Sequence, residues 1–165
     1  MGPLLVATGW LAMPAEARPN KACWMPSRLL YVGRSTLQYT GPAEAQRREA
    51  DAAALERRPA RRIGAGWLAV DIDRLTLEAA DPAHQLVVVE RGSEVVLRYE
   101  PPQAIPEADP EIPGFWYAYA VVPLPDGLAP PFRVEVVDRL QQIACAWTVD
   151  AHGEVALEGK RKAGE

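Results

Sequence analysis

The chain has 165 residues, a formal net charge of −4 and a pI of about 5.3. This length suits a single domain, residues 1–165, that can bury a core without disulfides or metal ions. Nucleic acid is an unlikely partner because most of the chain is acidic, and no segment is long and apolar enough to span a bilayer.

The charge is unevenly distributed along the chain. Residues 1–63 contain ten Lys and Arg against five Asp and Glu, whereas residues 64–165 contain eight against seventeen. A basic first third and an acidic remainder can pair within one fold or head to tail between copies. Pairing within the fold is the simpler interpretation.

The first apolar run, Leu4–Ala12, is followed by Ala15-Glu16-Ala17, which has the small residues of a signal-peptide cleavage site. No Lys or Arg precedes the run, so the positive n-region is missing. We therefore interpret Leu4–Leu11 as a first strand and favour a cytoplasmic chain over a secreted one. A signal peptide over Met1–Ala17 is the alternative.

The two cysteines, Cys23 and Cys145, lack metal-ligand spacing. Cys145 falls on the apolar face of its predicted strand, where a free cysteine acts as a small hydrophobe. A bond between the two needs an oxidising compartment, which the sequence does not establish. The pairing therefore stays open.

The first half of the chain predicts few strands. The proline-containing segment 12–27 predicts a loop, and Leu29–Val32 and Thr36–Tyr39 predict a hairpin that turns at Gly33-Arg34-Ser35. Good helix formers from Ala43 to Arg58, between Pro42 and Pro59, predict one helix. Because it has no apolar stripe, we expect this helix to be exposed on the surface.

The second half is rich in strands. After a strand at Trp67–Asp73 come the apolar segments Leu86–Val89, Val95–Tyr99, Phe115–Val122 and Phe132–Val149, with a last edge strand at Val155–Leu157. Period-two alternation in Phe132–Val136 and Ile143–Val149 predicts a hairpin with its turn at Asp138–Gln141. Phe115–Val122 is apolar on both faces, which predicts a central strand covered on both sides.

Short strands with proline-rich connections predict a mainly β fold, an antiparallel β-sandwich or a small barrel with one exposed helix at about residues 43–58. The order hairpin–helix–strands in residues 28–99 resembles a pleckstrin-homology-type barrel, although its lipid-binding signature is absent. The last hairpin, with Thr148–Gly153, is similar to the end of immunoglobulin-like and transthyretin-like sandwich modules. The arginine- and alanine-rich composition suggests a bacterial or phage origin.

Two charged segments are candidate contact surfaces. One is basic (Arg57, Arg58, Arg61 and Arg62) and the other is the tip of an acidic loop (Glu107, Asp109 and Glu111). We expect a non-catalytic binding or assembly module that contacts a protein partner or a second copy through them. The alternative is a barrel that binds a lipid or small molecule in a pocket lined by aromatic residues: Trp67, Trp116, Tyr119 and Trp147.

Evidence for catalysis is weak. Asp71 and Asp73 share one face of a strand and could hold a metal ion together with a histidine, but no further ligand follows from spacing. Without a phosphate-binding glycine loop, a zinc-ligand pair or a nucleophile elbow, we expect no catalytic residue, metal or cofactor, and an enzyme is the less favoured class.

Overall fold

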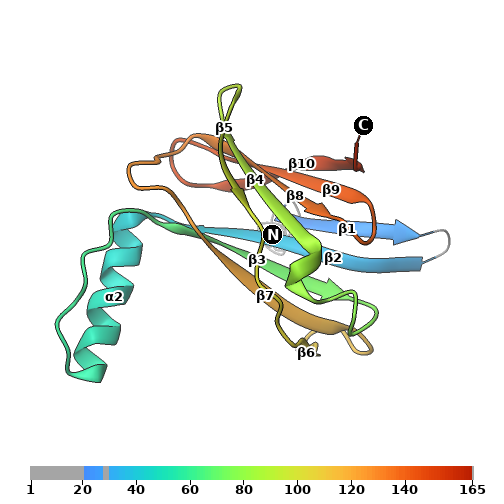
Figure 1. Ribbon diagram of the computed structural model, residues 1–165, viewed down its shortest axis with the longest axis horizontal. Helices are drawn as coiled ribbons and strands as arrows, with labels where there is room; N and C mark the ends of the chain where they lie inside the picture. The colour runs from blue at the N-terminus through green and yellow to red at the C-terminus, as the bar shows by residue number, and fades with distance from the viewer. Residues whose placement is uncertain (1–20, 28–29, 165) are drawn as a thin grey trace, which may run out of the picture.

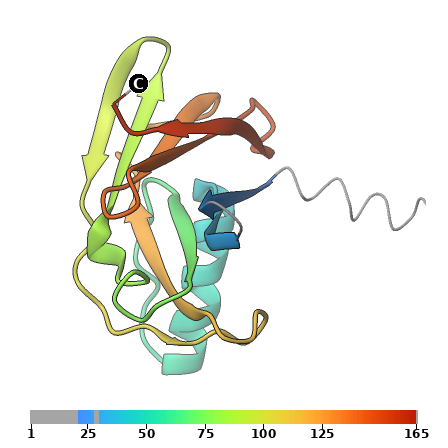
Figure 2. The same ribbon diagram turned by 90° about the vertical axis from the view of Figure 1, so that its right-hand side faces the viewer.

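Two five-stranded antiparallel sheets pack face to face in the computed structural model, which describes residues 21–27 and 30–164 (Figures 1 and 2). The predicted mainly β sandwich is confirmed, with one α-helix in the described part of the chain. The expectation of a barrel of the pleckstrin-homology type is wrong, because the two sheets stay separate and no strand pairing among the described residues closes them. The predicted strand Leu4–Leu11 lies outside the described residues. Within those residues, no helix is long and apolar enough to cross a membrane.

The elements follow in two layers. The first sheet has the order β1 (Ala22–Ser27), β2 (Leu30–Thr40), β3 (Trp67–Arg74), β7 (Trp116–Pro123) and β6 (Glu107–Ala108). The second sheet has the order β10 (Val155–Lys162), β9 (Ile143–Val149), β8 (Phe132–Asp138), β4 (Gln85–Arg91) and β5 (Glu94–Tyr99). Helix α2 (Pro42–Glu56) connects β2 to β3, and the short helix η2 (Pro82–His84) precedes β4.

The core lies between the sheets and follows the predicted alternation. Phe132, Val134 and Val136 of β8 are buried, and Trp147 of β9 is fully enclosed. Because successive strand side chains point to opposite faces, β8 presents Arg133 and Glu135 to the outside, whereas the outward residues of β9 include Ala144 and Ala146. The hairpins β4–β5 and β8–β9 are confirmed, and Gly92 has the positive φ that its turn requires.

Strand β7, which belongs to the first sheet, differs from the prediction that it is covered on both sides. It is covered on one face only, since Tyr119 and Val121 are exposed while Ala118 and Ala120 are buried. Its neighbour β6 is two residues long and covers only the start of the strand.

The predicted hairpin around Gly33 is wrong, because β2 runs through Gly33-Arg34-Ser35 without a turn. Glycine is needed there for close approach: a Cβ on Gly33 would lie 2.5 Å from Cδ of Arg74 and 2.8 Å from the carbonyl oxygen of Asp73. The predicted loop over 12–27 is wrong for its last part, which forms β1. Pro26 is tolerated because β1 is an edge strand and its register shifts at that residue.

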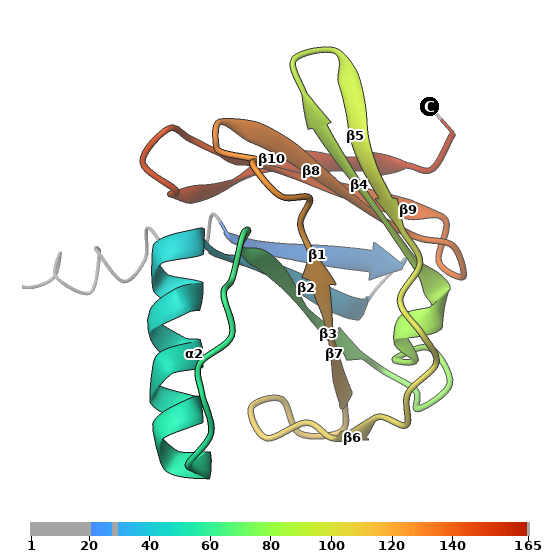
Figure 3. The same ribbon diagram turned by 60° about the vertical axis from the view of Figure 1, so that its left-hand side comes forward.

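Helix α2 projects from the end of the sandwich with the following chain beside it (Figures 1 and 3). We call residues 42–66 the arm. Gln46 bonds to Arg61 and Ile63 of the returning chain, while Ala45 and Ala53 are buried. The prediction of a surface helix is confirmed: its largest apolar side chain, Leu55, is 86% exposed.

Two buried links tie the sheets together. A disulfide joins Cys23 of β1 to Cys145 of β9. The guanidinium of Arg74, which is fully buried, donates to the carboxylate of Asp138 on β8 at 2.9 Å and to Ser35 Oγ at 3.0 Å. Burial lowers the pKa of Arg74, and the Asp138 carboxylate opposes this effect.

Candidate functional site

The outer face of the first sheet carries a polar cleft of about 510 Å³. Charged and hydrogen-bonding side chains from three strands line it, together with the segment that follows β6. The lining residues are Lys21, Ala22, Arg34, Thr36, Gln38, Asp71, Asp73, Asp109, Pro110, Glu111 and Tyr117. The cleft thus combines carboxylates, cations and neutral hydrogen-bonding groups on a rigid floor.

Strand register brings the floor residues together. Arg34 of β2 lies opposite Asp73 of β3, which lies opposite Tyr117 of β7. One step along the same face, Thr36 lies opposite Asp71. Cross-strand partners on one face have Cβ atoms about 4.5–5.5 Å apart, so residues distant in sequence meet here without any loop to position them.

The centre of the floor is a hydrogen-bonded group around Asp71. The hydroxyl of Tyr117 donates to Asp71 Oδ1 at 2.6 Å, and Nε2 of Gln38 donates to Oδ2 at 3.3 Å. Burial and the bond to Asp71 raise the pKa of Tyr117, so the phenol stays neutral and remains a donor. These contacts fix the orientation of the Asp71 carboxylate.

The segment 109–112, which we call the wall, closes one side of the cleft. Asp109 Oδ1 accepts hydrogen bonds from the amides of Glu111 and Ile112, at 2.8 and 3.0 Å. Arg34 joins the wall to the floor: its Nε donates to Asp73 Oδ2 at 3.0 Å and its Nη2 to Glu111 Oε1 at 2.9 Å. Although partial burial opposes it, this pairing raises the pKa of Arg34.

Asp73 lies beneath the wall and is 1% exposed. Burial, reinforced by hydrogen bonding to Asp109, raises the pKa of Asp73 to about 7, although Arg34 acts in the opposite direction. The pKa of Asp109 is lowered: partial burial would raise it, but hydrogen bonds from Asp73 and from the amides of Glu111 and Ile112 outweigh that effect. Below neutral pH, Asp73 is therefore a protonated acid beside an ionised one.

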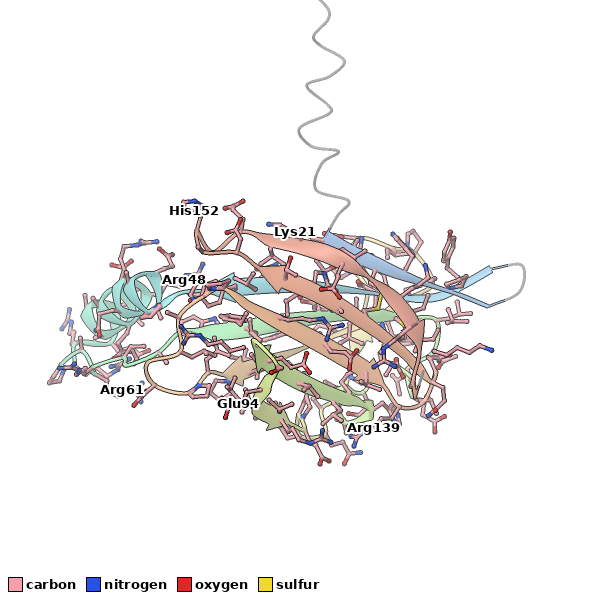
Figure 4. The ribbon with its side chains drawn as sticks, turned by 90° about the horizontal axis from the view of Figure 1, so that it is seen from above. Lys21, Arg48, Arg61, Glu94, Arg139 and His152 are labelled. Carbon is pink, nitrogen blue, oxygen red and sulfur yellow. A yellow bond between two sulfur atoms is a disulfide. The ribbon has the colours of Figure 1, made fainter. Side chains whose placement is uncertain are left out.

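The structure places the predicted contact residues in different surroundings. Asp109 and Glu111 line the cleft, and Glu107 is exposed on β6. The arginines belong to the arm, where Arg58 and Arg61 pair with Glu49 of α2 and Arg57 ends the helix in a left-handed conformation. Arg62 is exposed. Figure 4 shows Arg61 and Arg48 on the arm, far from Arg139 at the other end of the molecule.

The four aromatic pocket candidates also lie in different places. Trp147 is fully buried between the sheets, with its Nε1 donating to the carbonyl oxygen of Lys21 at 2.8 Å. Trp67 and Trp116 are half-buried, and Tyr119 is 58% exposed on the outer face of β7. Trp147 and Tyr119 therefore face opposite sides of the first sheet.

The predicted carboxylate pair, Asp71 and Asp73, forms part of the floor of the cleft. Asp73 is covered by Arg34 and the wall. Neither histidine reaches the cleft: His84 bonds to the carbonyl oxygen of Glu78, and His152 is exposed in a turn. In the described part of the chain, no group of three or more His, Cys, Asp or Glu residues could hold a metal ion.

The sequence prediction missed Arg34, Gln38 and Tyr117. The sequence of β2 contains a signal for two of them: the polar residues Arg34, Thr36 and Gln38 occupy every second position, as expected for one face of a strand. Reading Gly33-Arg34-Ser35 as a turn interrupted that pattern.

No protein-family model, no curated protein and no solved structure matches this chain.

Proposed function

We propose that the chain is a non-catalytic β-sandwich binding module whose cleft takes a small hydroxylated ligand of the saccharide class. The observation that carries this proposal is the convergence of fixed donors and acceptors on one sheet face: Arg34, Gln38, Asp71 and Tyr117 all line one cleft. A ligand with many hydroxyl groups, each both a donor and an acceptor, matches such a surface.

The charge of the lining supports a neutral or cationic ligand. Four carboxyl groups (Asp71, Asp73, Asp109 and Glu111) and two cationic groups (Lys21 and Arg34) line the cleft, so acidic groups are in excess even when Asp73 is protonated. The excess negative charge disfavours a phosphorylated or carboxylated ligand and favours an amine. An amino sugar should therefore bind more tightly than the neutral sugar, and a sugar phosphate most weakly.

The opposite outer face offers less to a ligand because its charges neutralise each other. Arg133 of β8 pairs with Glu90 of β4 and Glu158 of β10, both at 3.0 Å, and Arg161 pairs with Glu135 at 2.7 Å. Such cross-strand pairs stabilise the sheet and leave few unused hydrogen-bonding groups. This contrast favours the first sheet as the binding face.

Binding rather than hydrolysis is favoured by the position of Asp73. A general acid must reach the bond it protonates within hydrogen-bonding distance. The Asp73 carboxyl is 1% exposed and bonded to Arg34 and Asp109. Its proton therefore cannot reach a bond of a ligand in the cleft.

A matched set of three sugars tests the proposal. Amide chemical shifts would be followed by NMR while methyl glucoside, glucosamine or glucose 6-phosphate is added. We expect shifts confined to the cleft, with affinity falling in the order glucosamine, methyl glucoside, glucose 6-phosphate. Asp71→Asn should weaken glucosamine binding about tenfold, because it removes a charge-assisted hydrogen bond. Glu158→Gln, on the opposite face, is the control and should change nothing. Shifts outside the cleft, or none, would refute the proposal.

A second candidate function is contact with a protein partner or a second copy through the arm. It is favoured by the exposure of Leu55 at 86% and by the exposed charges of Arg57 and Arg62 nearby. Size-exclusion chromatography with in-line light scattering, at low and high salt, tests self-association. A dimer that Leu55→Ser and high salt both dissociate would support it, and a monomer under all conditions would exclude pairing between copies.

A further inference from the structure

We propose that Asp73 and Asp109 share one proton and act as a latch that holds the wall of the cleft against the sheet in acid and releases it when Asp73 ionises. This proposal concerns regulation of the same site, so its consequence for ligand binding rests on the proposed function. The latch itself requires no ligand and can be tested alone.

The hydrogen bonds of Asp109 indicate the shared proton. Its Oδ1 accepts two amides of the wall, whereas its Oδ2 is buried and has no other hydrogen-bond donor among the described residues. Leaving a buried carboxylate oxygen without a hydrogen-bond donor is unfavourable. The Asp73 carboxyl is within hydrogen-bonding reach and, when protonated, supplies the missing donor.

Other charged and titratable groups face the pair from the neighbouring strands. Arg34 on β2 stays cationic and already bonds to Asp73 and Glu111. On β3, Asp71 is bonded to Tyr117 of β7, whose raised pKa keeps it neutral, and Lys21 lies at the edge of the cleft. When Asp73 ionises, three carboxylates surround one guanidinium, and the wall carries two of them.

The wall has few other attachments to the sheet. Strand β6 pairs with β7 through two residues only, Glu107 opposite Tyr117 and Ala108 opposite Trp116. The backbone bonds from Asp109 to Phe115 and from Phe115 to Ile112 lie within the loop itself. Losing the contact between Asp73 and Asp109 therefore leaves the ion pair between Arg34 and Glu111 and the short strand β6 to hold the wall against the sheet.

The raised pKa of Asp73, about 7, determines how the position of the wall responds to pH. Below that value the proton is present and the wall is closed. Above it, repulsion between the carboxylates opens the wall, and the cleft loses Asp109 and Glu111 as lining residues. Asp73→Asn retains a donor, the amide N–H, at every pH and should keep the wall closed throughout.

An NMR titration of the ligand-free protein from pH 5 to 9 tests the latch. The carboxyl carbon of Asp73 and the amides of Glu111 and Ile112 should move together, with a midpoint near 7. In the variant Asp73→Asn, the amides of Glu111 and Ile112 should no longer show this titration midpoint. The matched control is Asp150→Asn: Asp150 also accepts two backbone amides in a turn, at 2.8 and 3.0 Å, but it is outside the cleft, so its variant should keep the midpoint.

Three outcomes would overturn the latch: titration of Asp73 near 4, wall amides that do not follow Asp73, or a midpoint that persists in Asp73→Asn. A repeat with methyl glucoside, whose charge does not change with pH, separates the two proposals. If the wall responds but the sugar does not bind at any pH, the proposed function fails and the latch stands. If the sugar binds equally at pH 6 and pH 8 while the wall does not respond, the latch fails and the function stands.

Discussion

The disulfide between Cys23 and Cys145 is expected to be a major source of stability. It closes a loop of 122 residues, joins β1 of one sheet to β9 of the other, and both cysteines are buried. A crosslink across so long a loop restricts the unfolded chain strongly. Removing it therefore destabilises the fold even where the native contacts survive.

The magnitude follows from the loop length. Loop-closure entropy for a separation of 122 residues corresponds to about 5 kcal/mol at 25 °C, and measured values for native disulfides are commonly about 2–5 kcal/mol. A domain of ordinary stability has about 5–15 kcal/mol in total. With the loop-closure value of about 5 kcal/mol, we expect the reduced chain to lose between about a third and all of its free energy of unfolding.

The assay is guanidinium denaturation of the oxidised chain, the reduced chain and the double variant Cys23→Ala/Cys145→Ala. The double variant controls for other effects of the reductant, since its denaturation midpoint should be the same with and without reductant. Two titratable thiols in the unreduced, unfolded protein, or equal midpoints for oxidised and reduced chains, would refute the reasoning. A confirmed bond favours an oxidising compartment over the cytoplasm expected from the missing n-region.

Three further predictions concern single side chains. Asp138→Ala leaves the fully buried guanidinium of Arg74 without its counter-ion and should cost about 3–5 kcal/mol in urea denaturation; a loss below 1 kcal/mol would contradict this. Gly33→Ala places a Cβ 2.8 Å from a backbone oxygen and should cost about 1–3 kcal/mol, whereas Gly159→Ala, with no atom within 4 Å, is its neutral control. The pKa of Asp73 is raised in the folded state to about 7, above its value in the unfolded chain, so its contribution to the free energy of unfolding should fall as pH rises from about 4 to 7. The difference in the free energy of unfolding between the wild type and Asp73→Asn should show this slope.

Much of the second sheet could be predicted because each of its strands shows its own pattern. In β8 the alternate residues Phe132, Val134 and Val136 are apolar and buried, so local sequence and burial agree there. The hairpin turn at Gly92 is equally local. The first sheet was harder to predict because its outer face is itself partly covered, and β7 exposes Tyr119 and Val121 where an apolar run suggested burial.

The errors at Gly33 and Pro26 have a common cause. Both residues are usual markers of turns, and in both places the tertiary structure requires them inside strands: Gly33 makes room for the side chain of Arg74, which is more than thirty residues away, and Pro26 lies on an edge strand. Neither requirement is visible in a local window of sequence. Only the pairing of β2 with β3 shows why glycine is needed there.

The cleft shows why a site of this kind is difficult to predict from one sequence. Asp73 is an ordinary carboxylate on the polar face of a strand until two distant residues, Arg34 and Asp109, reach it from other elements. The burial and the proton sharing that distinguish it arise from that assembly and not from any motif. A polar residue that lies on the outer face of a sheet and is nevertheless 1% exposed is therefore the useful signal, because something in the fold covers it. In this protein the cover is the wall, and its attachment through one proton connects the shape of the cleft to pH.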